Sequence, residues 1–245
     1  FYKFLMNNTD TKKIDLETSG TDSFYVAASD VKIFLENVTQ NPSSGSWGGG
    51  NFTFTVTVNT TGINNVTVFL WIGNSSTGPW TLIGQENYTI PPGGWQQFNF
   101  SKAFTCDDIS TKHFFFNATN YNLTTNMTSI QPFTIMKDNV TFEYIQGNNT
   151  IANRSGDQTD LLSIRLRDAN NTLLSNFNAT FYVKTNSFVY DSGTNVTSDS
   201  NGFANYSFNP ICTNPRYEVG DQNWKVAILQ QKCYEVNDTD SAGFA

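Results

Sequence analysis

The sequence has few charged residues. Lys, Arg, Asp and Glu make up 14% of its 245 residues, against roughly 25% in an average soluble domain. The formal net charge is −7 at pH 7, whereas nucleic acids and anionic membrane surfaces attract basic patches. Apolar runs are short, and none approaches the roughly 18 residues of a membrane-spanning helix. We therefore expect no nucleic-acid partner and no direct membrane span in this chain.

Histidine is almost absent, which removes much catalytic chemistry. His113 is the single histidine, so a multi-histidine metal site is excluded and a serine triad has one candidate base. No Gly-x-Ser-x-Gly elbow supplies a nucleophile, and Gly48-Gly49-Gly50 lacks the Lys-Ser/Thr of a phosphate-binding loop. The acids that could support glycoside hydrolysis are interpreted as solvated loop residues: Asp107 with Asp108, Asp157 with Asp160, and Glu143. We predict no catalytic residue and no enzyme.

A metal site has little support in the sequence. Loop acids near a domain junction leave a structural calcium ion open as an alternative. No Asp-x-Asp-x-Asp-Gly run is present, however. We therefore predict no metal ligands and no cofactor other than covalently attached glycans.

Cysteine is scarce, and its spacing fits neither zinc nor redox motifs. The three cysteines, Cys106, Cys212 and Cys233, contain no Cys-x-x-Cys pair. In an oxidising compartment we expect a bridge between Cys212 and Cys233, which closes a loop of 22 residues. Such a bridge contributes about 3 kcal/mol. Cys106 is then either buried and free or bonded to another chain.

Asn-x-Ser/Thr sequons are the dominant feature of the sequence. There are 19 of them, whereas random placement of the 31 Asn and the 51 Ser and Thr residues would give about six. This excess predicts dense N-glycosylation and therefore a secreted protein at the extracellular cell surface. The predicted acceptors are Asn7, Asn37, Asn51, Asn59, Asn65, Asn74, Asn87, Asn99, Asn117, Asn122, Asn126, Asn139, Asn148, Asn153, Asn170, Asn178, Asn195, Asn205 and Asn237.

The middle residue of the sequon is apolar in 12 of the 19 cases. Alternate residues of a β-strand point to opposite faces, so a sequon on a strand directs its Asn and Ser/Thr outward and its middle residue inward. The run 51–59 follows this pattern throughout, with Phe and Val alternating against Asn and Thr. The glycans are therefore predicted to stand on the sheet faces themselves. The apolar middle residues are Val38, Phe52, Val66, Tyr88, Phe100, Ala118, Leu123, Met127, Val140, Ala179, Val196 and Tyr206.

Strand-like runs separated by turn residues predict an all-β fold of two β-sandwiches. The first set of strands is expected at 23–28, 31–38, 51–59, 65–72, 80–84, 95–101, 112–119 and 130–136. The second is expected at 139–146, 160–168, 177–184, 187–191, 194–198, 202–209 and 223–230. The predicted domains are an extended N-terminal segment at 1–21, a sandwich at 22–137, and a second sandwich with a short C-terminal tail at 138–245.

Part of the second half resembles the Ig-like domains of bacterial and archaeal surface proteins. The matching features are a strand that ends in Asp168-Ala169-Asn170-Asn171, the alternating strand 179–183, the turn 197–204 and the late strand 224–227. The family carries Gly after the Asp-x-x-Asn start, where this chain has Asn171-Thr172. The first half looks like a more generic archaeal surface Ig-like domain. Together the two resemblances imply two tandem Ig-like domains.

The whole chain is similar to subunits of glycosylated archaeal extracellular filaments, which are small, rich in β-structure and in sequons, and low in charge. The resemblance implies a structural subunit that assembles with copies of itself by donor-strand complementation, in which the N-terminal segment of one subunit completes the sandwich of the next. The implied interface residues are Phe1, Tyr2, Phe4, Leu5, Ile14 and Leu16.

Other functions remain open at this stage. A monomeric adhesin or glycan-binding ectodomain predicts a patch free of sequons, for which segment 210–235 is the candidate. A surface-layer component is a further alternative. Four tryptophans are candidates for a sugar-stacking platform, with packing inside the chain as the competing interpretation: Trp47, Trp71, Trp80 and Trp95.

Overall fold

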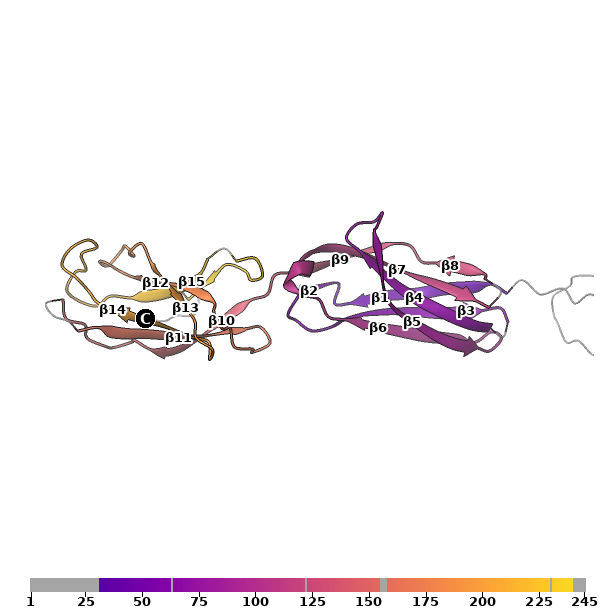
Figure 1. Ribbon diagram of the computed structural model, residues 1–245, viewed down its shortest axis with the longest axis horizontal. Coiled ribbons are helices and arrows are strands. Elements are labelled where there is room, and N and C mark those ends of the chain that lie inside the picture. The colour runs from indigo at the N-terminus through magenta and orange to yellow at the C-terminus, as the bar shows by residue number, and fades with distance from the viewer. Residues whose placement is uncertain (1–30, 63, 122, 155–157, 230, 240–245) are drawn as a thin grey trace, which may run out of the picture.

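The computed structural model describes residues 31–239 apart from 63, 122, 155–157 and 230 (Figure 1). The predicted N-terminal segment 1–21, with its six interface residues, and the expected strand 23–28 lie outside this range, as do the sequons at Asn7 and Asn122. The described chain is almost entirely β-structure, with one short 3-10 helix at Cys106–Asp108. The predicted all-β class is confirmed.

The strands form two groups that share no sheet, and Figure 1 shows the groups end to end along the long axis. The first group contains β1 (Ile33–Asn41), β2 (Ser44–Ser46), β3 (Phe52–Thr60), β4 (Asn64–Gly73), β5 (Trp80–Ile90), β6 (Trp95–Lys102), β7 (Ser110–Asn120), β8 (Thr125–Met127) and β9 (Gln131–Met136). The second contains β10 (Val140–Gln146), β11 (Asp160–Asp168), β12 (Asn178–Val183), β13 (Thr194–Thr197), β14 (Phe203–Phe208), β15 (Trp224–Ile228) and β16 (Asn237–Asp238).

In the first group, the sheet β1-β3-β6 packs against the six-stranded sheet β2-β9-β7-β4-β5, in which β8 pairs with β7. The core between them is rich in phenylalanine because inward-facing positions of β3 carry Phe52 and Phe54 and those of β7 carry Phe114 and Phe116. Phe54 is fully buried, with its ring centroid 4.9 Å from that of Phe114 and 5.2 Å from that of Phe133. The alternation predicted for 51–59 is therefore confirmed.

In the second group, the sheet β10-β11-β14 faces the sheet β13-β12-β15-β16. The core is smaller and centres on Phe181 of β12, whose ring stacks on Trp224 of β15 at 5.9 Å. Together the two groups give a sandwich-like arrangement with two separate hydrophobic cores.

The strand predictions fail mainly where strands are short. Residues 187–191 do not form a strand, because the Asn186 side chain accepts hydrogen bonds from the backbone N–H groups of Phe188 and Val189 and turns the chain. Tyr190 pairs with Lys184 as an isolated β-bridge outside the strands. Strands β2, β8 and β16 were not predicted, since two or three polar residues carry no periodicity.

The predicted disulfide between Cys212 and Cys233 is wrong: Cys106 is bonded to Cys233, and Cys212 is an exposed free cysteine. The reason is the direction of β15, which carries the chain from one end of the second group to the other. Cys212 lies on the near side of β15, 3.8 Å from the Arg154 carbonyl. Cys233 lies beyond it, at the end that meets the first group. The disulfide indicates an oxidising environment.

Candidate functional site

The sequon asparagines lie on the outside of the molecule. Of the 17 that the structure describes, 13 are exposed, none is buried, and four are partly buried: Asn59, Asn117, Asn148 and Asn237. Most stand within strands or at strand ends rather than in long loops. The described surface therefore presents these acceptor side chains on the sheet faces, as the alternation predicts.

The apolar middle residues mostly point inward. Six are buried: Phe52, Val66, Phe100, Ala118, Val140 and Ala179. Three are partly buried: Val38, Val196 and Tyr206. The three exposed exceptions, Tyr88, Leu123 and Met127, lie on the outer strand β5, on a loop, and on the three-residue strand β8, where no opposing sheet covers them.

Several sequon asparagines are held by hydrogen bonds to the carboxamide oxygen. Asn99 accepts from the hydroxyl of Thr55 at 2.8 Å, Asn195 from Thr180 at 2.7 Å and Asn205 from Ser163 at 2.6 Å. Asn178 accepts likewise from Thr197. A glycan is attached through the amide nitrogen, and in this arrangement that nitrogen is directed away from the donor. The cross-strand bond therefore fixes the rotamer of an acceptor without occupying its reactive atom.

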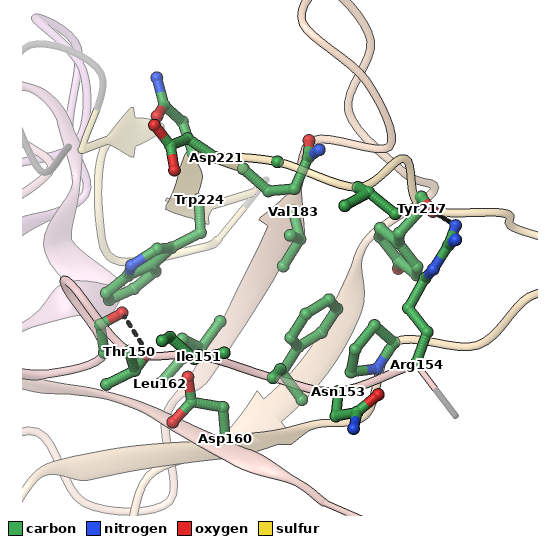
Figure 2. Close-up of a pocket in the computed structure, with 18 of the residues that line it drawn as sticks. Thr150, Ile151, Asn153, Arg154, Asp160, Leu162, Val183, Tyr217, Asp221 and Trp224 are labelled. Atoms are coloured by element: carbon green, nitrogen blue, oxygen red, sulfur yellow. Dashed lines mark hydrogen bonds between the residues drawn. The ribbon is translucent and has the colours of Figure 1, made fainter. Parts of the chain in front are cut away.

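A cavity of about 870 Å³ opens at the end of the second group that lies away from the first (Figures 1 and 2). Figure 2 shows Leu162, Val183 and Trp224 on its wall, with Arg154 beside Tyr217. The predicted sequon-free segment 210–235 contributes part of this wall. Its aromatic residues Tyr217 and Trp224 are buried core members, however, so they form no exposed aromatic patch.

Polar groups fix the inner end of the cavity. The Tyr217 hydroxyl donates to the Asp191 carboxylate at 2.7 Å, and burial together with this bond raises the pKa of Tyr217. The Trp224 indole N–H donates to the side-chain oxygen of Asn148 at 3.1 Å. Asn148 and Asn153, both sequon residues, stand at the cavity. The arrangement offers apolar walls and hydrogen-bonding groups, with no nucleophile–base pair among its described residues.

The junction between the two groups is held by a disulfide, a side-chain hydrogen bond and an aromatic contact. The Cys106–Cys233 disulfide crosses it, and the Trp47 indole N–H donates to the Cys233 carbonyl at 2.8 Å. The Trp47 ring also meets Tyr234 edge-on at 5.7 Å. Trp47 is thus a junction residue, and it takes no part in a sugar-stacking platform with Trp71, Trp80 and Trp95.

Two acids, Asp168 and Asp138, act on Tyr234 at this junction. Burial is the main cause of the raised pKa of Tyr234, and the negative charges of Asp168 and Asp138 raise it further. Asp138 is fully buried; one of its carboxylate oxygens accepts from the Asn139 backbone N–H, and the other, Oδ2, has no partner. No group of three or more His, Cys, Asp or Glu residues is placed to hold a metal ion within the described ranges.

Gly48 is expected to be essential for this junction. A Cβ atom on Gly48 would lie 2.4 Å from Asp138 Oδ2, well inside van der Waals contact. Gly48→Ala therefore forces a buried carboxylate out of position and should cost about 1–3 kcal/mol of stability, measured by urea denaturation. Because the obstacle is the carboxylate, adding Asp138→Ala should recover most of the loss. Equal stability of Gly48→Ala and the parent protein would contradict the packing described here.

The remaining tryptophans form two separate features. Trp71 and Trp80 both contact Phe115 on the outer face of the six-stranded sheet, with ring centroids 6.4 Å and 4.8 Å away. These contacts support the interpretation of packing inside the chain. Trp95 lies on the outer face of the other sheet, β1-β3-β6, and is 68% exposed.

The candidate acids and the histidine do not assemble into a catalytic group in the described chain. Asp107 pairs with Lys232 at 2.5 Å across the junction, and Glu143 pairs with Arg167 at 3.4 Å. Asp108 accepts hydrogen bonds from Thr105; these bonds and the charge of Lys112 outweigh the effect of burial and lower the pKa of Asp108. His113 lies on β7, with a buried Nδ1 that has no partner.

Comparisons with known proteins leave the family open. No protein-family model matches the chain, and no curated protein matches it. A tetra-tandem repeat from the extending region of a large adhesion protein is similar with a TM-score of 0.41 and 13% identity, over 85% of this chain and 48% of that one. Red sea bream transglutaminase is similar with a TM-score of 0.33 and 9% identity, over 85% of this chain and 30% of that one.

An alkylpurine DNA glycosylase of Pseudomonas fluorescens gives a TM-score of 0.34 and 12% identity, over 42% of this chain and 30% of that one. The chain thus spans less than half the length of each of these three proteins. At such TM-scores the likenesses assign neither a family nor a function. No helix in the described residues is long and apolar enough to cross a membrane.

Proposed function

We propose that the chain is a structural subunit of an extracellular, heavily N-glycosylated cell-surface filament. The observation that carries the proposal is the placement of the sequons: all 17 described acceptor asparagines lie outside the two cores, mostly on strands. A bulky glycan can be carried only at a position outside the cores, and every described sequon asparagine meets this requirement. A coat on the sheet faces would supply the solubility that the low charge content does not.

The architecture fits this role as two tandem Ig-like domains, at 22–137 and 138–245, after the extended N-terminal segment 1–21. The supporting features are the paired sheets, the separate cores and a strand pairing that is antiparallel except between β2 and β9. The short connection between β9 and β10 and the disulfide across the junction join the two domains stiffly. A stiff, elongated unit suits a filament better than a hinged one.

The subunits are proposed to join by donor-strand complementation. Outer strands such as β14 pair on one side only within the described sheets, and an open edge of this kind accepts an added strand. The apolar N-terminal residues Phe1, Phe4 and Leu5 would fill the adjacent core. Each large apolar side chain that becomes fully buried contributes about 1.5–3 kcal/mol.

Deleting residues 1–17 should yield folded monomers that do not assemble, because the donor segment is gone and both cores remain. Electron microscopy of the full-length and truncated chains, with glycopeptide mass spectrometry on both, tests assembly and the coat separately. Normal filaments from the truncated chain would overturn donor-strand assembly. Unmodified sequons throughout would overturn the glycan coat.

A second candidate function is a glycan-binding adhesin, and the cavity at the far end of the second group favours it. Its apolar wall and convergent polar groups fit a small organic ligand or a sugar. Binding to a glycan array by the full chain, lost on Asp221→Ala at the exposed part of the cavity but retained on Trp95→Ala, would support this function. An array without any binding would count against it.

A further inference from the structure

One sequon asparagine lies between two exposed aromatic side chains. In the sheet β1-β3-β6, Asn59 of β3 pairs with Phe34 of β1 on one side and with Trp95 of β6 on the other. Paired residues of neighbouring strands project from the same face, with Cβ atoms about 4.5–5.5 Å apart. Phe34 is 40% and Trp95 68% exposed. The three side chains therefore form a row across the outer face.

The remainder of this face is polar and slightly hollowed. A shallow groove of about 450 Å³ is lined by Trp95 and Asn59 together with Glu36, Asn37, Thr39, Thr55, Thr57 and Gln97. Hydroxyl, amide and carboxylate groups thus surround one exposed indole face. Stacking on an aromatic ring combined with hydrogen bonds from neighbouring polar groups is a usual way to hold a sugar ring, which has an apolar face and hydroxyl edges.

The exposed aromatics have no counterpart elsewhere on this face. The alternation of β3 places Thr53, Thr55 and Thr57 outward, and β6 places Gln97 and Asn99 there. Phe34 and Trp95 are therefore the exposed aromatic side chains among polar neighbours on this face. A sugar ring seated against the indole and Phe34 would cover this apolar surface.

We propose that the glycan carried by Asn59 folds back onto this row. Its first sugar rings pack against the indole of Trp95, and the side of the glycan contacts Phe34. The groove is then a modification site with its own docking surface. A second protein chain fits less well as the occupant, because Asn37, Asn59 and Asn99 all present sequons here, and glycans on them would hold another protein away. The inference rests on the proposed glycosylation.

The test uses the full chain produced in a glycosylating host, with the variants Trp95→Ala, Asn59→Gln and the double variant. Glycopeptide mass spectrometry reports the occupancy of Asn59, and thermal unfolding reports stability. Each single variant should lower the melting temperature of the first group by about 4 °C, the shift of a modest interaction in a domain of this size. The double variant should lose no more than either single one, since both remove the same contact.

Asn99→Gln is the matched control. Asn99 is also an exposed strand asparagine in a sequon and lies in the same sheet, but its cross-strand partner is Thr55 instead of an aromatic residue. Its effect should add to that of Trp95→Ala. In protein made without glycosylation, Trp95→Ala should leave the melting temperature unchanged.

The outcomes separate the two proposals. Occupancy at Asn59 with coupled variants supports the docking surface. Occupancy at Asn59 with additive variants overturns it and leaves the glycan coat standing, as does a bare Asn59 among occupied sequons. A chain with every sequon bare overturns the coat and the docking surface together.

Discussion

Replacing Cys106 and Cys233 with serine is expected to lower the free energy of unfolding of the second group by about 4–5 kcal/mol. The disulfide joins residues 127 positions apart. While the first group remains folded, Cys106 is held beside the junction, so unfolding the second group opens a loop of roughly 100 residues that the bond keeps closed. Loop-closure entropy for that length gives this magnitude. Urea denaturation of the reduced and oxidised parent protein and of the double variant measures the loss.

Cys212→Ser is the control for this experiment. Cys212 is exposed and outside the disulfide, so its substitution should change stability by no more than about 0.5 kcal/mol. If the double variant and Cys212→Ser unfold at the same urea concentration, the disulfide does not stabilise the second group.

Truncating a core phenylalanine is expected to destabilise one group and spare the other. Phe54 is fully buried and contacts Phe114 and Phe133 in the first core, while Phe181 is fully buried in the second. Phe→Ala at such sites costs about 3–5 kcal/mol. Phe54→Ala should therefore lower the melting temperature of the first group by more than 10 °C, at about 4–8 °C per kcal/mol for a domain of this size.

Phe181→Ala is the reciprocal experiment. Because the cores share no residue, calorimetry should resolve two transitions and show each variant shifting a different one. If both variants shift one common transition to the same extent, the two groups unfold as a single unit and the junction couples them more strongly than its contacts indicate.

Most of the fold follows from local patterns in the sequence. The alternation in 51–59 indicated both the strand and its buried face. Because alternate residues of a strand share a face, Phe52 and Phe54 must lie together on the apolar side. The strand 160–168 was predicted with its observed bounds. Short strands such as β2 could not be predicted from the sequence, since the strands they pair with lie far along the chain.

The cysteine pairing and the candidate site could be identified only from the three-dimensional structure. A short sequence separation favoured Cys212 with Cys233, whereas the direction of β15 brings Cys233 to Cys106. The tryptophans look alike in the sequence, yet only the register of three strands shows that Trp95 lies beside Asn59. Sequons could be found from the sequence; their neighbours across the sheet could not.

The disulfide also determines how the chain would carry tension. A pull applied between residues 31 and 239 follows the covalent backbone to Cys106, crosses to Cys233 and continues to the end. Residues 107–232 form a side loop outside this load path, so β7 to β15 bear no direct force. Under oxidising conditions the load path would lengthen through the residues before Cys106 and the few after Cys233, about 3.3–3.6 Å for each residue released. Apart from β16, the second group would be carried intact while the first is stretched.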